Sequence, residues 1–568
     1  MSKELVDLIS VARGEKAADL VLANAAIINV FSGEVEMGSV AIHGGKIAGI
    51  GDYRRAEEVI DLDGRYLAPG LINGHTHIES SMLDIGQYVR AVVARGTLAV
   101  VTDLHEFSNV CGMVAIDYIL GVARQLPLDL FLMAPSCVPA THLETAGACM
   151  EAEELKKVLQ MKGVIGLGEM MNFPGVINAF DNVVSKIAMA QGGLIDGHAP
   201  GLGGKDLNAY IAAGIYSDHE SVTLEEAAEK LKRGMHIMIR EGSSEKNLEA
   251  LLPLVNDKTY KRCLLVVDDR SCADLLRDGD INAVVRKAIK LGLEPVRAIQ
   301  LATINPAEYF GLKGLGAVAP GYAANLIVVD NLSDFNIEKA FYKGKLVADG
   351  GKALFETAEY RGKKPVNTVD IKPFSVEGLK LIARGDSLPV IGVVPGQIIT
   401  RKIIEKIEVV DGVVMPDTER DLLKLVVVER HKASGNIGIG LVRGFGLKRG
   451  ALASSIAHDS HNVIAVGTSD ADIYAAVRHI EKIKGGLVVV ADGKVLADLP
   501  LPIGGLLSDQ PLEEVVAQLE RLKTLALELG SQLQSPFATL SFMALPVIPE
   551  LRLTDLGLVD VGQFKIID

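Results

Sequence analysis

Between about residues 67 and 304, short apolar segments alternate with longer segments of helical periodicity, and no other feature limits the possible folds of this chain so strongly. Parallel strands need long crossover connections, which are usually helices, so the alternation is typical of a parallel β/α array. We expect eight strands, at Leu67–Ile72, Leu98–Thr102, Leu128–Ala134, Val164–Gly168, Leu194–Gly197, Gly214–Ser217, Met235–Ile239 and Cys263–Val267. Eight strands in roughly 250 residues is the size of a TIM barrel. The sequence therefore predicts an α/β fold with a (β/α)8 TIM-like barrel.

The segments on either side of the barrel have a different pattern. Both contain short apolar stretches separated by glycine turns, which is typical of small antiparallel sheets. We therefore expect a split, composite β-sandwich domain formed by residues 1–66 plus 311–375, around a barrel domain of residues 67–310. After a connection that contains proline and has little periodicity, residues 390–568 predict an additional C-terminal α/β domain.

Polar side chains follow the predicted barrel strands almost immediately. In a barrel of this kind the functional groups gather at the carboxyl ends of the strands, so residues far apart in the sequence meet at one mouth. The residues concerned are His75, His77, Asp103, His105, Glu169, His198, His219, Arg240, Asp268 and Asp269. We expect them to form one cluster.

Two histidines end the first predicted strand, in the run Pro69-Gly70-Leu71-Ile72-Asn73-Gly74-His75-Thr76-His77. Because strand residues alternate between faces, His75 and His77 project to the same side. Taken alone, such a pair is more often surface or core filler than a metal site. With further imidazoles and carboxylates at neighbouring strand ends, however, it has the donor chemistry of a two-metal hydrolytic site, which suits Zn, Mn or Fe.

The composition argues against several classes of partner. The chain has 58 Lys and Arg against 72 Asp and Glu, and its net charge of −14 would repel nucleic acid and anionic membranes. The five cysteines are widely spaced and contain no Cys-x-x-Cys, as is usual in a reducing cytosol. We therefore expect a cytoplasmic enzyme with no nucleic-acid and no membrane partner.

The run that ends in His77 resembles the first-strand signature of the amidohydrolase superfamily, whose members pair a metal-bearing barrel with a split β-sandwich. The rest of the chain is similar, more narrowly, to the adenine deaminase family. The segments that carry this resemblance are His77–Met82, Thr102–Glu106, Ser136–Ala140, Gly168–Val176, Asp196–Lys205, Asp218–Ser221, Ile239–Ser243, Asp268–Arg270, His458–Asn462 and Leu499–Leu506. The similarity includes a C-terminal domain that most amidohydrolases lack.

The resemblance implies a set of metal ligands. His75 and His77 would bind a first ion, and His198 and His219 a second. Glu169 would take the bridging place that a carbamylated lysine occupies in many relatives, since it also offers two oxygens and one negative charge. Asp268 would touch a metal and take a proton from the attacking water, so its pKa must suit that task.

The resemblance also implies roles around the ligands. The implied catalytic residues are Asp268, Glu169, His105 and Asp103, and the implied substrate-binding residues are Glu106, Arg240, Asp269 and Glu220. Asp103 and Glu220 could instead orient the metal-bound imidazoles. For His458 and His461 we expect a structural or domain-interface role, because no third ligand lies nearby in the sequence.

The implied activity is the hydrolytic deamination of adenine to hypoxanthine and ammonia by a metal-activated hydroxide, in purine salvage. The partners would be adenine and water, the cofactors two divalent metal ions, Mn or Fe in preference to Zn, and the assembly a homo-oligomer. Superfamily ligands alone do not select the substrate, so a cyclic amide or a different aminopurine stays an alternative. A third hypothesis is a non-enzymatic protein that keeps the barrel only as a scaffold. The complete set of expected metal ligands disfavours it.

Overall fold

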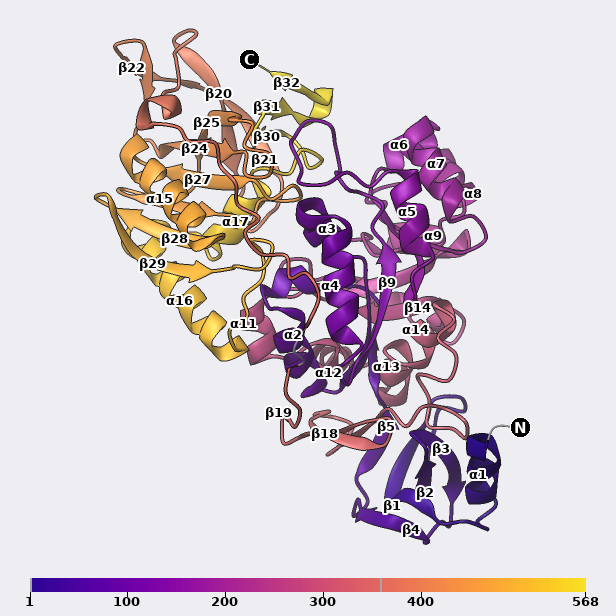
Figure 1. Ribbon diagram of the computed structural model, residues 1–568. Coiled ribbons are helices and arrows are strands. Elements are labelled where there is room, and N and C mark those ends of the chain that lie inside the picture. Colours follow the sequence, from indigo (N-terminus) through magenta and orange to yellow (C-terminus); the bar gives the residue numbers. More distant parts are fainter. Residues whose placement is uncertain (1–2, 358–359, 568) are drawn as a thin grey trace.

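The computed structural model describes residues 3–357 and 360–567. In Figure 1 the N-terminal strands lie at one end, and the middle region (residues 67–310) separates them from the C-terminal region (residues 390–567). The last two regions are joined by main-chain hydrogen bonds, since Ser508 donates to the carbonyl of Met82 and accepts from the N–H of Asp84, both at 2.8 Å. Side chains of both regions also belong to one continuous hydrophobic core.

A nine-stranded sheet draws its strands from both sides of the middle region. Strand β5 joins the two sets, because it pairs in parallel with β1 and antiparallel with β16. The strands are β1 (Ala18–Asn29), β2 (Glu34–His43), β3 (Lys46–Gly51), β4 (Ala56–Asp61), β5 (Tyr66–Pro69), β16 (Leu326–Val329), β17 (Ile337–Tyr342), β18 (Lys345–Asp349) and β19 (Lys352–Ala353). Helix α1 (Lys3–Ala12) lies against this sheet (Figure 1). The two flanking segments therefore form a single sheet.

The middle region contains parallel strands in three hydrogen-bonded groups. The first group has the order β11-β10-β9-β8-β6, the second is β12-β13-β14, and the third is β15-β7. Because β7 follows β6 in the chain and β15 follows β14, the β7–β15 pair links the first group to the second. The strands are β6 (Leu71–Asn73), β7 (Thr76–His77), β8 (Thr97–Thr102), β9 (Asp129–Ala134), β10 (Val164–Met170), β11 (Leu194–Gly197), β12 (Ser217–Asp218), β13 (His236–Arg240), β14 (Cys263–Val266) and β15 (Asp268–Asp269).

Two predicted strands differ from the observed ones. The segment Leu67–Ile72 is split between two sheets, with β5 in the nine-stranded sheet and β6 in the parallel one. The break falls at Gly70, where a Cβ atom would lie 2.6 Å from Leu98 Cδ1, so the close approach of the two sheets requires glycine. The predicted strand Gly214–Ser217 begins too early. Gly214 has φ of +100° and ends the turn after helix α8 (Gly204–Ala212), so β12 starts only at Ser217.

Helices and short 3-10 turns connect the parallel strands. The segments Glu151–Met161 and Leu224–Arg233, whose sequences have helical spacing, contain α5 (Ala152–Leu159) and α9 (Leu224–Lys232). The Thr223 hydroxyl caps α9 by accepting from Glu226 N at 3.3 Å. The helices are α2 (Ile85–Val93), α3 (His105–Cys111), α4 (Met113–Ala123), α5 (Ala152–Leu159), α6 (Phe173–Ile177), α7 (Asp181–Met189), α8 (Gly204–Ala212), α9 (Leu224–Lys232), α10 (Leu248–Leu251), α11 (Cys272–Arg277), α12 (Ile281–Lys290), α13 (Pro295–Leu301) and α14 (Ile304–Tyr309). The 3-10 turns are Ile78–Ser81, Leu252–Leu254 and Tyr260–Arg262.

The C-terminal region is built on an eight-stranded sheet of order β21-β20-β25-β24-β27-β26-β28-β29. Its strands are β20 (Ser387–Val393), β21 (Thr400–Lys406), β24 (Leu422–Val428), β25 (Ile437–Arg443), β26 (Ala451–Ser454), β27 (Val463–Gly467), β28 (Gly486–Ala491) and β29 (Lys494–Pro500). Both faces are covered, because alternate residues of β24 belong to two different cores: Leu425 packs on the side of the middle region, and Val426 on the side of α15. The remaining elements are β22 (Glu408–Val410), β23 (Val413–Met415), β30 (Leu551–Thr554), β31 (Gly557–Asp560), β32 (Lys565–Ile567), α15 (Asp470–Ile483), α16 (Leu512–Glu528), α17 (Pro536–Phe542) and a 3-10 turn at Val376–Leu379 and another at Val561–Gln563.

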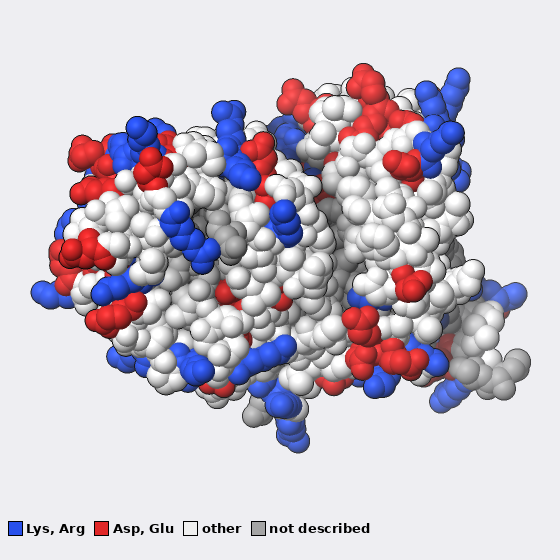
Figure 2. Space-filling view, turned by 90° about the horizontal axis from the view of Figure 1, so that it is seen from above, with Lys and Arg blue, Asp and Glu red and all other residues white. Residues whose placement is uncertain are grey.

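The molecule is thus of the mixed α/β type, and its surface carries charges of both signs. Figure 2 shows lysines and arginines interspersed with acidic residues on the face that it presents, with no continuous basic patch there. Among the described helices, none combines the length and the apolarity that crossing a membrane requires. All five cysteines are free thiols.

Candidate metal centre

The polar residues expected at the strand ends meet at the carboxyl ends of the parallel strands. His77 ends β7, Glu169 lies near the end of β10, and Arg240 ends β13. Residues directly after other strands complete the group, namely Asp103, His198 and His219, together with His75 before β7 and Asp268 and Asp269 in β15. Side chains separated by almost 200 residues in sequence therefore surround one point.

Glu169 lies at the centre of this cluster. Its Oε2 is 2.7 Å from His198 Nδ1 and 3.2 Å from His219 Nε2, whereas its Oε1 is 3.4 Å from His77 Nε2. The two carboxylate oxygens thus face two different sets of imidazoles. The sets are also in contact with each other, because the ring of His75 stacks on that of His219 with centroids 4.2 Å apart. This geometry is what a carboxylate needs to bridge two cations.

Asp268 faces the first pair of histidines. Its Oδ1 is 3.4 Å from His75 Nε2 and 3.2 Å from His77 Nε2. Its Oδ2 accepts a hydrogen bond of 2.8 Å from Arg240, whose guanidinium also donates to both oxygens of Glu220 at 2.5 and 2.9 Å. Arg240 and Glu220 therefore pair with each other, and the guanidinium fixes the orientation of Asp268.

The residues present fit a divalent metal centre. Donor atoms lie within 4.8 Å of one another in several buried groups, including His75 with His77 and Asp268, His75 with Glu169 and His219, and His198 with His219 and Glu220. One ring nitrogen on the side of Asp268, His75 Nε2, is buried without a hydrogen-bond partner, which is costly unless another ligand satisfies it. Imidazole and carboxylate donors in this number suit first-row divalent ions.

The electrostatics of the cluster point the same way. Burial opposes the charged forms of Glu169 and Asp268, but attraction to the neighbouring donors outweighs it and lowers the pKa of each. The neighbouring His198 and His219 therefore hold the pKa of Glu169 well below its usual range, and His75, His77 and Arg240 do the same for the pKa of Asp268. Both carboxylates are ionised at neutral pH, as metal ligands must be.

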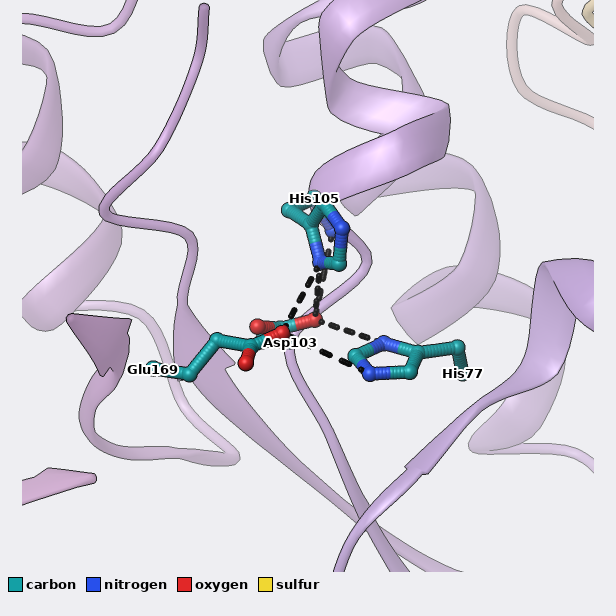
Figure 3. A group of neighbouring side chains, drawn as sticks. All are labelled: His77, Asp103, His105 and Glu169. Atoms are coloured by element: carbon teal, nitrogen blue, oxygen red, sulfur yellow. Dashed lines mark hydrogen bonds and ion pairs between the residues drawn. The ribbon is translucent and has the colours of Figure 1, made fainter. Parts of the chain in front are cut away.

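Figure 3 shows how Asp103 and His105 contact this cluster. Asp103 Oδ1 lies 3.2 Å from His77 Nδ1 and 3.0 Å from His105 Nδ1, and His105 Nδ1 is 3.6 Å from Glu169 Oε1. Because His77 turns its other nitrogen, Nε2, toward Glu169 and Asp268, the carboxylate of Asp103 stands behind the ring. This placement favours an orienting role for Asp103 over contact with a substrate.

Two of the expected substrate-binding residues have partners outside the cluster. Glu106 Oε1 is 2.6 Å from His458 Nδ1, and Asp269 accepts a hydrogen bond from the Ser80 hydroxyl. Sequence reasoning missed Glu79, whose pKa rises to about 7 because it is buried beside the carboxylate of Glu106. It also did not predict the pairing of His458 with Glu106, although the segment that contains His458 carries part of the family resemblance and was the available signal.

Comparisons with known proteins bear on both halves of the chain. A model described as "Amidohydrolase family" matches residues 66–347, and one described as "Adenine deaminase C-terminal domain" matches residues 397–565. An adenine deaminase of Dehalococcoides mccartyi is 63% identical over 567 residues, which covers 100% of this chain and 99% of that protein. Adenine deaminase 2 of Carboxydothermus hydrogenoformans is 50% identical over 566 residues, with 100% and 99% covered. A crystal structure of an adenine deaminase is 18% identical with a TM-score of 0.45, and the match covers 58% of this chain and 99% of that one.

Proposed function

Because the chain belongs to the adenine deaminase family, we propose that it is a metal-dependent hydrolase that converts adenine and water to hypoxanthine and ammonia. The observation that carries this proposal is the position of Glu169, whose two carboxylate oxygens face two sets of imidazoles at the ends of the parallel strands. Identity to adenine deaminases along the whole chain supports adenine over a cyclic amide or another aminopurine.

We propose that the cluster holds two divalent ions, Mn or Fe in preference to Zn. His75, His77 and Asp268 would hold one ion, His198 and His219 the other, and Glu169 both. A divalent ion bound there would lower the pKa of a coordinated water from 15.7 to about 7.

Asp268 is the proposed base in this reaction. Its carboxylate is ionised, is held by Arg240 through a 2.8 Å hydrogen bond, and lies beside both first-strand histidines. It can therefore accept one proton of the water as the oxygen adds to C6 of the purine, and the ring nitrogen N1 takes up a proton. Arg240 and Glu220, which pair with each other, act on Asp268 in this scheme. We therefore propose a positioning role for both, beside the substrate-binding role that the resemblance implies.

We also propose that the three groups of parallel strands close into one (β/α)8 barrel of residues 67–310. Two observations support closure. The β7–β15 pair links the first and the second group, and the gap between β11 and β12 is spanned by a hydrogen bond of 3.1 Å from Gly197 N to Ser217 Oγ. A β-sandwich domain of residues 1–66 plus 311–375 and an α/β domain of residues 390–568 complete the proposed layout. A place in purine salvage, a cytoplasmic location and a homo-oligomeric assembly stay predictions from the sequence.

A steady-state assay tests the activity. Purified protein reconstituted with Mn, Fe or Zn is supplied with adenine, adenosine, guanine or dihydroorotate, and the release of ammonia and the loss of substrate are measured. We expect turnover of adenine with stoichiometric ammonia. Inertness toward adenine combined with turnover of the cyclic amide would overturn the proposal in favour of the alternative.

A further inference from the structure

The loop between β26 and β27 (residues 455–462) reaches from the C-terminal region to the carboxyl ends of the parallel strands. Its His458 Nδ1 lies 2.6 Å from Glu106 Oε1 at the start of α3. Its Ser460 hydroxyl donates to Glu144, and Asn462 Nδ2 donates to the carbonyl of Thr145 at 2.8 Å. The β26–β27 loop is therefore docked on two of the connections that follow barrel strands, beside the metal centre.

Buried donors hold this loop in place. Arg430 is fully buried, and its guanidinium donates to the carbonyl of His461 within the loop and, at 3.1 Å, to the carbonyl of Gly504. His431 Nε2 donates to the carbonyl of Ser460 at 2.7 Å. Burying the Arg430 cation is costly unless its N–H groups are hydrogen-bonded. Because carbonyls of the loop provide part of this bonding, the conformation of the loop is tightly specified.

The surroundings of His458 favour its protonated form. Burial alone would lower the pKa of its imidazole, but the carboxylate of Glu106 outweighs burial and raises the pKa to about 9. The other charged or titratable groups that face the ring are Asp459 and His461 of the loop, Asp269 of β15 and, through Glu106, His105 of α3. The ring is oriented by stacking on Phe542, with centroids 4.5 Å apart and planes inclined by 22°.

His458 is close to the proposed site of reaction. Its partner Glu106 is adjacent in sequence to His105, whose Nδ1 is 3.6 Å from the central Glu169. With Nδ1 turned to Glu106, the second ring nitrogen, Nε2, makes no hydrogen bond to any residue that the structure describes. Nε2–H is thus a charged donor without a partner among the described side chains.

A third metal site at this place is disfavoured by the hydrogen bonding of His461. Glu106, His458 and His461 together present donor atoms close enough to hold an ion. However, His461 Nδ1 accepts the N–H of Ala457 at 3.3 Å, so Nε2 carries the ring proton. That N–H faces Glu106 Oε2 at 3.6 Å. A nitrogen that carries a proton cannot ligate a metal. Glu106 therefore pairs with His458, while His461 Nε2 lies beside it without a hydrogen bond.

We propose that His458 donates the proton that the departing amino nitrogen of adenine takes, that Glu106 is its positioning residue, and that the C-terminal region therefore completes the active site. The proposal rests on the deamination of adenine proposed above. The chemical reason is that an amide anion is far too basic to leave, so the nitrogen on C6 must be protonated before the carbon–nitrogen bond breaks.

The protons and electrons of this step balance. After the water oxygen has added to C6 and N1 has gained a proton, Nε2–H of His458 protonates the exocyclic nitrogen. The bond between C6 and that nitrogen then breaks, its electron pair leaves with ammonia, and the oxygen on C6 becomes a carbonyl as it loses its remaining proton. That proton restores His458 by way of Asp268 or solvent. The two protons of one water thus end on N1 and on ammonia.

The test compares adenine with 6-chloropurine, because chloride leaves without a proton while the addition of water at C6 is the same. In His458→Gln we expect kcat for adenine to fall by about 100-fold or more, and kcat for 6-chloropurine by less than about threefold. The variant should keep the metal content of the parent. In the parent, kcat for adenine should decline above about pH 9, and this basic limb should be absent with 6-chloropurine.

Glu106→Gln gives a second measurement that does not depend on turnover. Histidine ¹⁵N NMR of the protein reconstituted with Zn, a diamagnetic ion, should show a ring that titrates near pH 9. This signal should disappear in His458→Gln and move to lower pH in Glu106→Gln. His479→Gln is the matched control, since His479 forms a carboxylate pair of the same 2.6 Å length with Asp498 away from the centre, and both substrates should be turned over as by the parent. Equal losses for both purines in His458→Gln, or no loss for adenine, would overturn the role of His458. A parent protein that is inert toward adenine would instead contradict the proposed function itself.

Discussion

The ligand cluster around Glu169 and the Glu106–His458 pair are neighbours, yet the chain assembles them in different ways. Every member of the ligand cluster lies on or next to a parallel strand of the middle region, so the parallel strands position them all. The Glu106–His458 pair joins the start of α3 to a loop of the C-terminal sheet, more than 350 residues further along the chain. Strand geometry therefore positions the proposed metal ligands, whereas the packing of two regions positions the proposed proton donor.

The largest expected effect comes from Glu169→Gln, which tests the first half of this comparison. The amide removes the negative charge and one of the two oxygens that face the imidazoles. We expect the metal content per chain to fall and turnover of adenine to drop on the order of 1,000-fold or more, beyond the losses usual for groups that only orient ligands. Elemental analysis and steady-state kinetics measure both quantities. Glu249→Gln, at an exposed position of α10, is the control. Equal activity of the two variants would contradict the proposed role of Glu169 as a bridging ligand.

A second effect concerns the stability that the Glu106–His458 pair contributes. Since the pKa of His458 is raised to about 9 from 6.5, its contribution is fully present below about pH 6.5 and is lost as the pH rises through about 9. A shift of this size corresponds to about 3 kcal/mol. We expect the melting temperature of His458→Gln to lie several degrees below that of the parent at pH 6, and the gap to close near pH 10. A gap that does not depend on pH would show that packing of the ring, and not its charge, stabilises the loop.

The parallel strands show how far the sequence could predict the fold. Strands β8, β9, β10, β11, β13 and β14 begin and end within two residues of the predicted positions. Their length and apolar character follow from burial on both faces, which leaves a continuous apolar run in the sequence. The two errors arise at glycines. Gly70 divides an apolar run because of a close contact with Leu98, and Gly214 belongs to a turn with positive φ. Hydrophobicity alone predicts neither.

The part of the candidate site that lies at the strand ends was also predictable from the sequence. Residues directly after parallel strands share one edge of a sheet, so strand ends alone predicted which imidazoles and carboxylates the structure brings together. The pairing of Glu106 with His458 could not be obtained in this way. It depends on how the C-terminal sheet docks, and the sequence around His458 has no periodicity that relates it to α3. Likewise, only the structure shows that Arg240 is occupied by Glu220 and Asp268.

A smaller effect is expected from Asp103→Asn, which sharpens the distinction between holding a metal and orienting its ligand. Asp103 stands behind His77 and contacts His105 as well, so the amide weakens the orientation of the ring without removing a bridging oxygen. We expect metal affinity, measured by titration calorimetry, to fall about 10–100-fold, with kcat largely recovered at saturating metal. Unchanged affinity combined with a reduced kcat would assign Asp103 to the substrate instead.

The smallest effect should come from His479→Gln, which tests how burial changes the contribution of two ion pairs with the same separation. His479 and Asp498 lie 2.6 Å apart, the same distance as His458 and Glu106, but the side chain of Asp498 is 34% exposed whereas that of Glu106 is 7% exposed. Water and salt screen a pair as open as that one, so it contributes about 0–1 kcal/mol. We expect a change of melting temperature near the error of calorimetry and unaltered kcat with adenine. A loss as large as that of His458→Gln would mean that burial does not distinguish the two pairs, and the contrast between the docked loop and the rest of the C-terminal sheet would fail.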